Sequence, residues 1–556
     1  MKLTSPQRAV PALDTPKQQP VSAPGRALSC GLLLMGWLAF LAVAAAQVPY
    51  ERIRDAHKEP GNWLTYSGNY LGHRYSPLDQ VRADNVQRLK IDWVHQATAS
   101  TDGFQVSPIV ADGVMYISEP PNIVKAIDLN SGRTFWTYQR SIPTDLRLCC
   151  GRPNRGVAIL GSRVFLTTIG AHTIALDAAT GRLLWDVEMA DYKQGYSATL
   201  APLAIKDKVI VGVAGGEFGI RGFIDAYDAA TGKRVWRFYT VPTAGEFGVE
   251  TWAGESYKTG AASLWVTGSY DSDTNTVFWG TGNPGPGWNG DSRKGDNLFS
   301  DCVVALDGDT GRRKWHFQFT PHDTHDWDST QVPVLIDAPF RGENRRLLVT
   351  ANRNAFFYAL DRASGKFLQG KPYVKQTWAS GLDDNGRPQV LPNTTPTEEG
   401  NQLWPDLGGG TNWYSPSYSP KTGMFYAPVR EAGAIYYKGE AEFKAGTFFN
   451  GGGQRSIPGE EAVGSIRALD PATGDLKWKF PLTRPATAGI LTTGGGLLFT
   501  GTSLGEFLAL DATTGKLLWS IKLGGGVSSG PIGYMHNGKQ YIAIAAGRGL
   551  FNFALD

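Results

Sequence analysis

Cysteine and histidine are scarce in this 556-residue chain, which contains four of the first and eight of the second. No C-x-x-C-H motif occurs, so the chain carries no covalently attached c-type haem. Neither sign of charge is in large excess, with 54 Lys and Arg residues against 51 Asp and Glu residues. This balance gives no electrostatic footprint for nucleic acid or for an anionic membrane.

One apolar run, residues 31–46, lies near the N-terminus and is too short and too small-sided for a membrane span. It follows the basic residues Lys2, Arg8, Lys17 and Arg26. It ends in Ala44-Ala45-Ala46 before Gln47, as at an A-x-A cleavage site. We therefore expect residues 1–46 to be a signal peptide that exports the protein and takes Cys30 with it. The alternative is an uncleaved anchor.

A repeated pattern, A-x-D-x-x-[ST]-G-x-x-x-W, accounts for much of the remaining chain. Complete copies occupy Ala126–Trp136, Ala175–Trp185, Ala226–Trp236, Ala305–Trp315, Ala468–Trp478 and Ala509–Trp519. Ala359–Leu368 lacks the tryptophan, and Ser417–Tyr426 matches more weakly. In each copy we expect an apolar strand that ends at Asp, a D-x-x-T-G turn with positive φ at Gly, and a second strand that carries Trp.

Four short strands per repeat, at spacings of 41 to 54 residues where the repeat is unbroken, are typical of propeller blades. Eight copies predict that residues 47–556 form one all-β domain, an eight-bladed β-propeller with tryptophan-docking repeats. A strand from the other terminus would close the last blade. The wider gaps, 226 to 305 and 359 to 468, leave room for an extra weak blade and for long insertions.

Because a propeller gathers its loops at two ends of a central channel, segments that interrupt the repeat are the candidates for a functional site. Residues 321–329, P-H-D-T-H-D-W-D-S, hold three carboxylates and two imidazoles. Asp326 and Asp328 would point to one side of an extended segment, where a hard cation with oxygen ligands would relieve their repulsion. For this motif alone, a solvated acidic loop is an equal alternative.

Further interruptions occur along the chain. They are Cys149-Cys150, Gly215-Gly216-Glu217, residues 280–288 (G-T-G-N-P-G-P-G-W, with Asn283), Arg353-Asn354, and residues 408–414 (G-G-G-T-N-W-Y, with Asn412 and Trp413). Adjacent cysteines in an exported protein are expected to form a disulfide, with two free thiols as the alternative. A charge at Arg353, inside an apolar strand, needs a buried anionic partner. Cys302 lies in a repeat strand and is expected to be a small buried apolar residue.

Together these segments resemble the pyrroloquinoline quinone (PQQ)-dependent alcohol dehydrogenases, the family of methanol and ethanol quinoprotein dehydrogenases. The similarity runs from about Trp63 to the C-terminus, with the motifs in the family's order and spacing. It implies a periplasmic enzyme that oxidises a small primary alcohol to an aldehyde with PQQ and a metal ion. A periplasmic c-type cytochrome would accept the electrons, and the protein could be a homodimer, as family members often are.

The resemblance also implies roles for single residues. A vicinal disulfide, Cys149–Cys150, and the indole of Trp265 would lie on the two faces of the quinone. Further contacts to the quinone would come from Arg155, Thr168, Gly215, Gly216, Ser263, Arg353, Asn412 and Trp413. Glu217, Asn283 and Asp326 would hold the metal. Asp326 would also be the general base, taking the hydroxyl proton of the alcohol while hydride passes to C5 of the quinone.

Asp328 bears on the identity of the metal. Calcium members of the family commonly carry a small apolar residue two positions after the catalytic Asp, whereas lanthanide members carry Asp. Glu217, Asp326 and Asp328 would supply three carboxylates, which favours a trivalent ion because the attraction grows with charge. We therefore expect a lanthanide, with Ca²⁺ as the alternative.

The chain departs from the family at two places. Gln105 stands where the methanol enzymes have Glu, and Thr324-His325 replace the usual Glu-Trp before the base. We expect His325 to pack against the channel wall; narrowing the pocket or tuning Asp326 are the other possibilities. Two other functions stay open: a non-enzymatic propeller scaffold of the cell envelope, which gives no reason to retain these residues together, and a quinoprotein that acts on sugars or polyols.

Overall fold

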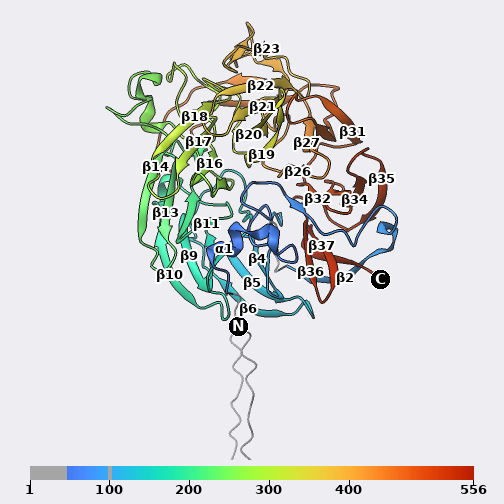
Figure 1. The fold of residues 1–556 in the computed structure, drawn as a ribbon. Coiled ribbons are helices and arrows are strands. Elements are labelled where there is room, and N and C mark those ends of the chain that lie inside the picture. Colours follow the sequence, from blue (N-terminus) through green and yellow to red (C-terminus); the bar gives the residue numbers. More distant parts are fainter. Residues whose placement is uncertain (1–46, 98–102) are drawn as a thin grey trace, which may run out of the picture. The chain divides into compact units, whose positions relative to one another are not determined.

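The computed structural model describes residues 47–97 and 103–556, so the expected signal peptide, residues 1–46, lies outside the described part. The described residues are almost entirely β-structure and form eight sheets of four or five strands, together with a three-stranded and a two-stranded sheet. The sheets surround a common centre (Figure 1). Within the described residues no helix is long and apolar enough to cross a membrane.

The first four sheets follow one another along the chain. Sheet 1 contains β3 (Ile109–Ala111), β4 (Val114–Glu119), β5 (Ile123–Asp128) and β6 (Thr134–Gln139). Sheet 2 contains β7 (Ala158–Leu160), β8 (Arg163–Thr167), β9 (His172–Asp177) and β10 (Leu183–Glu188). Sheet 3 contains β11 (Leu203–Ile205), β12 (Lys208–Gly212), β13 (Phe223–Asp228) and β14 (Arg234–Tyr239). Sheet 4 contains β15 (Ser269–Asp271), β16 (Thr276–Gly280), β17 (Cys302–Asp307) and β18 (Arg313–Gln318).

The other four continue to the C-terminus. Sheet 5 contains β19 (Val334–Phe340), β20 (Glu343–Ala351), β21 (Phe356–Asp361) and β22 (Phe367–Pro372). Sheet 6 contains β26 (Ser417–Ser419), β27 (Met424–Glu431), β30 (Val463–Leu469) and β31 (Leu476–Leu482). Sheet 7 contains β32 (Leu491–Thr493), β33 (Leu497–Gly501), β34 (Glu506–Asp511), β35 (Leu517–Lys522) and the added strand β1 (Tyr75–Ser76). Sheet 8 contains β36 (Ile532–His536), β37 (Lys539–Ala546), β38 (Gly549–Leu555) and β2 (Leu89–Gln96).

Small elements are inserted between and within these sheets. The two small sheets contain β23 (Ala379–Leu382) and β24 (Pro388–Val390), and β25 (Asn401–Leu403), β28 (Ala434–Lys438) and β29 (Gly452–Ser456). One short α-helix, α1 (Tyr50–Arg54), begins the described part. Single 3₁₀ turns lie at Ala56–Lys58, Val86–Arg88, Tyr192–Gln194, Gly216–Phe218, Val249–Thr251 and Ser256–Thr259. The β28–β29 hairpin is inserted between β27 and β30 of sheet 6.

In each of the eight sheets four strands pair in antiparallel order, from a first inner strand to a fourth outer one. The added strand β1 of sheet 7 pairs parallel with β32. The D-x-x-T-G turns join the third strand to the fourth, as at residues 177–181 between β9 and β10. In such a meander, the connections from second to third strand and from one sheet to the next therefore lie at the opposite end. The segments that interrupt the repeat belong to these connections.

The D-x-x-T-G turn is built by its own side chains. In the second copy the Asp177 carboxylate accepts hydrogen bonds from the backbone N–H and the hydroxyl of Thr180, at 2.9 and 2.8 Å. Gly181 N–H donates to the Asp177 carbonyl at 2.8 Å, with φ of +71° at the glycine. This left-handed conformation favours glycine, as the repeat predicts.

In six of the eight sheets the tryptophan of the outer strand packs on the turn of the following sheet. Trp136 of β6 covers Gly181 of sheet 2 so closely that a Cβ there would lie 2.5 Å from the indole, and its Nε1–H donates to the Ala178 carbonyl at 3.0 Å. The same contact with a glycine recurs for Trp185, Trp236, Trp315 and Trp478. Trp93 of β2 covers Gly132 of sheet 1 in the same way, so sheet 8 is joined to sheet 1.

Two pairs of neighbouring sheets, 5 with 6 and 7 with 8, are joined without an indole packed on a glycine. Ala359–Leu368 has no tryptophan, and there Gln369 donates to the Thr473 carbonyl of sheet 6. Trp519 of sheet 7 packs edge-on against Phe553 of sheet 8, with ring centroids 5.7 Å apart. These contacts link the eight sheets of the described part in one cyclic order.

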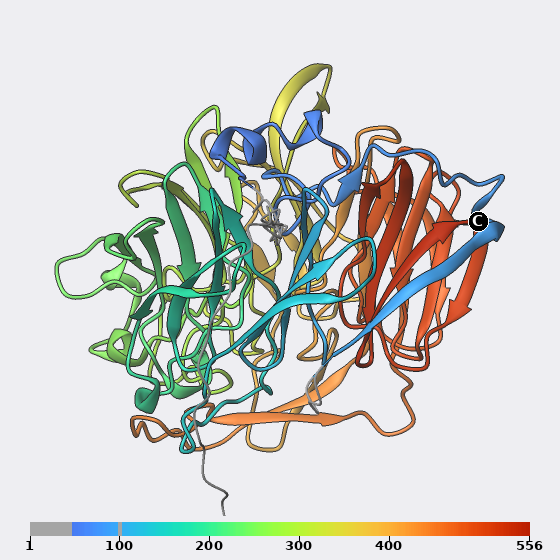
Figure 2. The ribbon, with the colours of Figure 1, turned by 90° about the horizontal axis from the view of Figure 1, so that it is seen from below.

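One of the expected copies of the repeat is not a copy in the structure. Ser417–Tyr426 is not a turn between third and fourth strands but the β26–β27 hairpin of sheet 6, whose turn of the repeat is residues 470–474. The eighth sheet has no copy of the motif, because its outer strand β2 comes from the N-terminal side and pairs antiparallel with β38. Figure 2 shows this blue strand beside the red C-terminal strands.

We predict that Gly181→Ala destabilises the protein more than Gly423→Ala. The two glycines have nearly the same φ, +71° and +68°, and both follow a threonine, but a Cβ at position 423 would meet nothing within 4 Å. Backbone strain should cost about 1–2 kcal/mol at both sites. The clash with Trp136 should add about 1–3 kcal/mol at Gly181. Guanidinium denaturation measures both, and equal losses would contradict the docking role of the indole.

Candidate functional site

A cavity of about 460 Å³ opens at the end of the fold opposite the D-x-x-T-G turns. Its lining comes from connections between sheets and from connections between second and third strands. Of the residues expected at the site, it is lined by Cys149, Cys150, Arg155, Gly215, Glu217, Ser263, Trp265, Asp326, Asp328, Arg353, Asn412 and Trp413. Segments far apart in the sequence therefore meet at one place.

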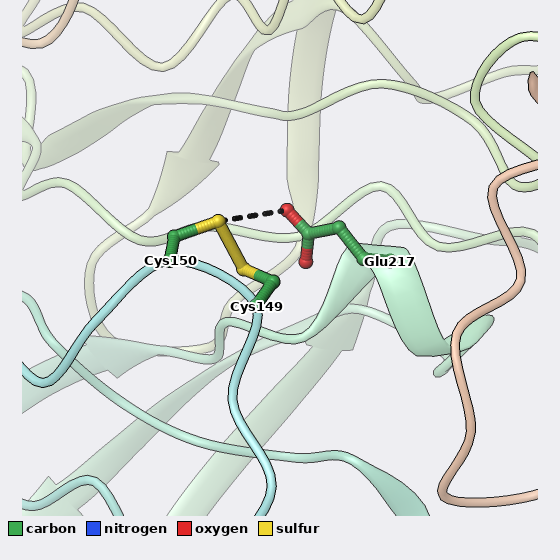
Figure 3. A group of neighbouring side chains, drawn as sticks. All are labelled: Cys149, Cys150 and Glu217. Atoms are coloured by element: carbon green, nitrogen blue, oxygen red, sulfur yellow. Dashed lines mark hydrogen bonds between the residues drawn. A yellow bond between two sulfur atoms is a disulfide. The ribbon is translucent and has the colours of Figure 1, made fainter. Parts of the chain in front are cut away.

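The adjacent cysteines form one wall of the cavity. Cys149 and Cys150 are joined by a disulfide, which confirms the expectation for this pair, and both are exposed to the cavity. The sulfur of Cys150 lies 3.8 Å from Oε1 of Glu217 (Figure 3). A sulfur in a disulfide carries no hydrogen and is no thiolate, so the carboxylate is the ionic ligand in this group. Burial raises the pKa of Glu217 to about 7, helped by the charge of Asp328.

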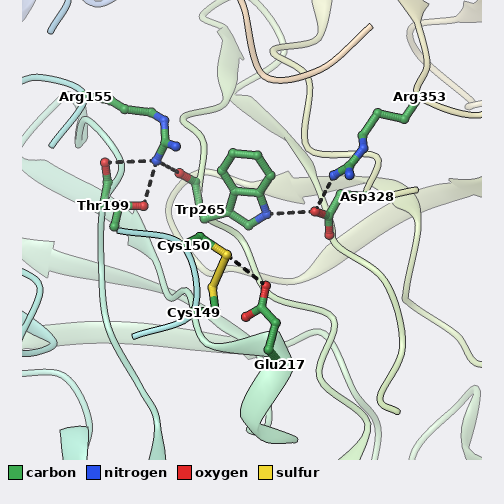
Figure 4. Close-up of a disulfide and its surroundings, with 8 residues drawn as sticks. All are labelled: Cys149, Cys150, Arg155, Thr199, Glu217, Trp265, Asp328 and Arg353. Atoms are coloured by element: carbon green, nitrogen blue, oxygen red, sulfur yellow. Dashed lines mark hydrogen bonds and ion pairs between the residues drawn. A yellow bond between two sulfur atoms is a disulfide. The ribbon is translucent and has the colours of Figure 1, made fainter. Parts of the chain in front are cut away.

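A buried arginine lies beside the disulfide. The Arg155 guanidinium stacks on the rings of Trp265 and Trp413, with its carbon 4.9 and 4.6 Å from their centroids. Its Nη1 donates to the hydroxyl of Thr199 at 2.7 Å (Figure 4). Among the described residues no carboxylate pairs with Arg155, so its charge is balanced only by ring faces and neutral oxygens. It is suited to an anionic group of a ligand.

Asp328 is the most extensively bonded carboxylate of the cavity. One oxygen accepts from Nη1 of Arg353 at 2.7 Å and from Nε1 of Trp265 at 3.1 Å (Figure 4). The other oxygen accepts from the backbone N–H of Asn283 at 2.9 Å. Arg353 is thus paired with a buried anion, as expected, but it lies in the turn between β20 and β21 and not inside a strand. Its Nη2 donates to the Leu407 carbonyl.

Asp326 lies two residues earlier and differs from Asp328. Within residues 47–97 and 103–556 no donor lies within hydrogen-bonding distance of its carboxylate, and its φ is +60°. Burial raises its pKa well above the usual range, and Asp328 and Glu217 reinforce the effect while Arg353 opposes it. Backbone strain of this kind persists only where surrounding contacts enforce it.

The neighbouring Asp323 supplies such contacts. Its two carboxylate oxygens accept from the backbone N–H groups of His325 and Trp327, at 2.9 and 2.8 Å, on either side of Asp326. Burial opposes ionisation of Asp323, but these hydrogen bonds and nearby His325 outweigh it and hold its pKa below the usual value. The sequence alone indicated no role for Asp323, the third carboxylate of the motif.

His325 packs into the wall next to this loop. Its ring stacks on Trp327, with centroids 4.2 Å apart, and meets Tyr436 edge-on. One ring nitrogen lies 2.8 Å from the Thr394 carbonyl. The side chain is buried, which agrees with the expected packing role. Gln105, the other departure noted in the sequence, lines the cavity.

Three expected residues do not line the cavity. Thr168 is fully buried and closes the β8–β9 turn, where its hydroxyl accepts from the N–H of His172 at 3.2 Å. Gly216 begins the 3₁₀ turn that carries Glu217, and a Cβ there would lie 3.2 Å from Ser263 Oγ. Asn283 reaches the site through its backbone bond to Asp328.

Other lining residues were missed by sequence analysis. They include Ser197, Thr199, Asp406, Tyr414 and Arg430. Thr199 and Ser197 lie in S-A-T-L-A, a stretch without charge or unusual composition. Arg430 lies near the end of the apolar strand β27, and Arg353 follows the end of the apolar strand β20. This similar position in the sequence could have identified Arg430. Its Nη2 lies 3.4 Å from Asp406.

The chain is similar to known proteins over most of its length. Residues 63–370 match the family model described as glucose/ethanol/alcohol dehydrogenase, beta-propeller domain. The chain is 38% identical over 554 residues to quinoprotein alcohol dehydrogenase PedH of Pseudomonas putida, covering 95% of this chain and 93% of that protein. It belongs to the PQQ-dependent alcohol dehydrogenase family. The match over residues 462–553 to the outer membrane protein assembly factor BamB covers a smaller part.

Some further relatives are described by the metal that they use or contain. The lanthanide-dependent methanol dehydrogenase of Methylacidiphilum fumariolicum is 36% identical over 552 residues, covering 93% of this chain and 89% of that protein. A solved europium-containing methanol dehydrogenase superposes with a TM-score of 0.86 at 33% identity, covering 91% of this chain and 100% of that one. The quinohemoprotein alcohol dehydrogenase of Comamonas testosteroni gives the same score and identity, covering 92% and 83%.

The cavity fits the groups that this family uses. Several buried polar atoms in its wall have no partner among the described residues: Gln105 Oε1, Arg155 Nε, Arg353 Nε, Asp406 Oδ1 and Arg430 Nε. Buried polar atoms are normally paired, so these atoms suit a polar ligand rather than an empty space. The carboxylates of Glu217, Asp326 and Asp328 suit a cation in the same cavity.

In the metal-free protein we predict that Asp328→Ala lowers the free energy of unfolding by about 3–5 kcal/mol, because it leaves Arg353 buried without its anion. Asp84→Ala is the control, since Asp84 pairs with Arg82 at 3.3 Å with both side chains largely exposed. Such surface pairs are worth less than about 1 kcal/mol. Chemical denaturation measures both variants, and a loss at Asp328 as small as that at Asp84 would contradict the buried pair.

Proposed function

We propose that the protein is a PQQ-dependent dehydrogenase that oxidises small primary alcohols to aldehydes, with Asp326 as the general base. The observation that carries this proposal is the meeting of a vicinal disulfide, two buried arginines and three carboxylates in one cavity. A scaffold without catalysis has no use for this arrangement, because buried charges cost free energy unless they serve a ligand. Family membership supports the same chemistry.

The quinone would be held by residues of two kinds. The disulfide Cys149–Cys150 and the indole of Trp265 would contact its flat faces. Its carboxylates and carbonyls would be bound by Arg155, Ser263, Gly215 and Gly216, and Arg353 would bond its reactive oxygens. Asn412 and Trp413 would line the same pocket. We add Thr199, which accepts a hydrogen bond from Arg155 and lines the cavity, whereas Thr168 does not line it. When bound, the quinone accepts hydride and the metal acts as a Lewis acid on it.

Glu217, Asn283, Asp326 and Asp328 would hold the metal. Three carboxylates favour a lanthanide over Ca²⁺, and the two lanthanide-type relatives support this choice. Asp326 would accept the hydroxyl proton of the alcohol at its carboxylate. A carboxylate is a workable base here because departure of hydride acidifies the hydroxyl in the transition state.

We further propose the setting in which this enzyme works. The eight sheets would form a closed eight-bladed propeller over residues 47–556, with β2 completing the last blade. Residues 1–46 would be a signal peptide that directs the protein to the periplasm. A periplasmic c-type cytochrome would take the electrons, since the chain has no C-x-x-C-H motif of its own, and the enzyme could act as a homodimer.

The metal can be tested with purified apoprotein supplied with PQQ and either La³⁺ or Ca²⁺. We expect dye-linked oxidation of primary alcohols with La³⁺, and its loss in Asp328→Ala. Activity with Ca²⁺ alone would contradict the metal assignment and leave the enzyme class intact. No quinone binding and no activity with either ion would contradict the proposed function as a whole.

Asp326→Asn should lower kcat by about 10²–10⁴-fold, the usual contribution of a general base. The amide keeps the size of the side chain and an oxygen ligand but has lost its basicity. The measurement is steady-state kinetics at saturating metal and quinone, with quenching of tryptophan fluorescence as the check that the quinone still binds. A kcat within tenfold of the wild type, with both groups bound, would assign the base to another residue.

A further inference from the structure

Two long connections supply most of the proposed metal ligands. Residues 281–301, between β16 and β17, carry Asn283, and residues 319–333, between β18 and β19, carry Asp326 and Asp328. Near the cavity the two connections meet at the bond from Asn283 N–H to Asp328. Other backbone hydrogen bonds join the same connections: Ser329 N–H donates to the Thr281 carbonyl at 3.0 Å, His322 N–H to Asp296 at 3.2 Å and Phe319 N–H to Asp301 at 2.8 Å. None of these bonds reaches the turn at residues 284–290 or the carbonyl of Asp323, where a side chain supplies a further tie.

Arg293 provides that tie behind the cavity. Its Nη2 donates to the carbonyl of Asp323 at 2.6 Å and to the carbonyl of Pro286 at 2.9 Å. Its Nε also donates to Pro286 at 3.1 Å, and Nη1 donates to Oδ1 of Asn297 at 2.8 Å. One guanidinium thus bridges the connection that carries Asn283 and the connection that carries Asp326.

The environment of Arg293 is unusual for a charged side chain. It is fully buried, and in the described part of the chain no carboxylate lies within ion-pairing distance of it. Burial lowers its pKa to about 10, so it stays charged at neutral pH. Its partners are backbone carbonyls and one amide, which a planar group with five donors can bridge and a lysine ammonium cannot.

The contact continues from Asp323 to the proposed base. Arg293 holds the backbone carbonyl of Asp323, and the carboxylate of the same residue holds the N–H groups of His325 and Trp327. Asp326 lies between those two residues, in a left-handed conformation with no donor to its own carboxylate among the described residues. The position of Asp326 therefore depends on bonds made by its neighbours.

We propose that Arg293 is a positioning residue that keeps the Asn283 and Asp326 connections in register and so sets the distance between the metal ligands. This inference rests on the proposed function for its consequence, a tight metal site, but the tie itself is independent of catalysis. Arg293 does not line the cavity, and none of its hydrogen-bonded partners lines it.

The test compares Arg293→Lys with Arg74→Lys. Arg74 is equally buried and also bonds only neutral groups, namely the carbonyls of Tyr66 and Pro531 and the hydroxyl of Ser107. None of these partners lies in a connection that carries a proposed metal ligand. Both variants should lose thermal stability, and Arg74→Lys measures the effect of a merely structural role.

Two measurements separate the roles. Hydrogen–deuterium exchange of residues 321–329 should become at least tenfold faster in Arg293→Lys and stay within twofold of wild type in Arg74→Lys. The dissociation constant for Eu³⁺, followed by its luminescence, should rise at least tenfold in Arg293→Lys alone, with kcat falling more than KM changes. Equal exchange and equal Eu³⁺ affinity in the two variants, at matched loss of stability, would overturn the proposal.

Arg293→Gln keeps the test decisive if Arg293→Lys does not fold. Its single amide can donate to the Pro286 carbonyl or to the Asp323 carbonyl but is too short to bridge the two connections. The proposal expects the same faster exchange and weaker Eu³⁺ binding, and wild-type values would overturn it. If the wild-type protein bound no Eu³⁺, the lanthanide assignment would fail, whereas the exchange comparison would still decide the role of Arg293.

Discussion

The docking of an indole on a glycine turn is the contact on which the rest of the structure depends. Six of the eight sheets present the glycine of their turn to the tryptophan of the sheet before, as Trp136 and Gly181 illustrate. The contact works only because the glycine has no Cβ and the turn is held by its own aspartate. This contact fixes the packing of neighbouring sheets at the end where the turns lie. The connections at the opposite end can therefore vary in length.

The connections at this free end form the site, and its charged side chains are arranged in two layers. In the cavity, Asp328 has the buried Arg353 as its partner, while the Asp326 carboxylate has no donor among the described residues. Behind the cavity, Asp323 and Arg293 hold the backbone on which both carboxylates stand. Asp323 and Arg293 bond to backbone groups, so the Asp326 carboxylate stays available for the role that we propose for it.

The sequence predicted the repeat and the disulfide, because each leaves a local signal: Gly181 and Trp136 occur at fixed offsets, and Cys149 and Cys150 are adjacent. Arg353 stands out in an apolar stretch, whereas Arg155, Ser263 and Trp265 were expected in the cavity only from the family resemblance. The eighth sheet has no copy of the repeat motif, since its strands come from both ends of the described chain. Ser417–Tyr426 resembles the repeat because β-hairpin turns use the same residue types. Thr199 and Arg293 could not be predicted, because their roles come only from distant partners such as Arg155 and Asp323.

Arg353 and Asp328 also connect the two groups that we propose for the cavity. While they pair with each other, Arg353 cancels one of the three negative charges offered to a cation. An anionic quinone that draws Arg353 toward itself would release that charge for the metal, and a metal bound to Asp328 would release Arg353 for the quinone. Because such coupling is reciprocal, each ligand would strengthen the binding of the other by the same factor. Through this one buried ion pair, the occupancy of the site by either group would depend on the presence of the other.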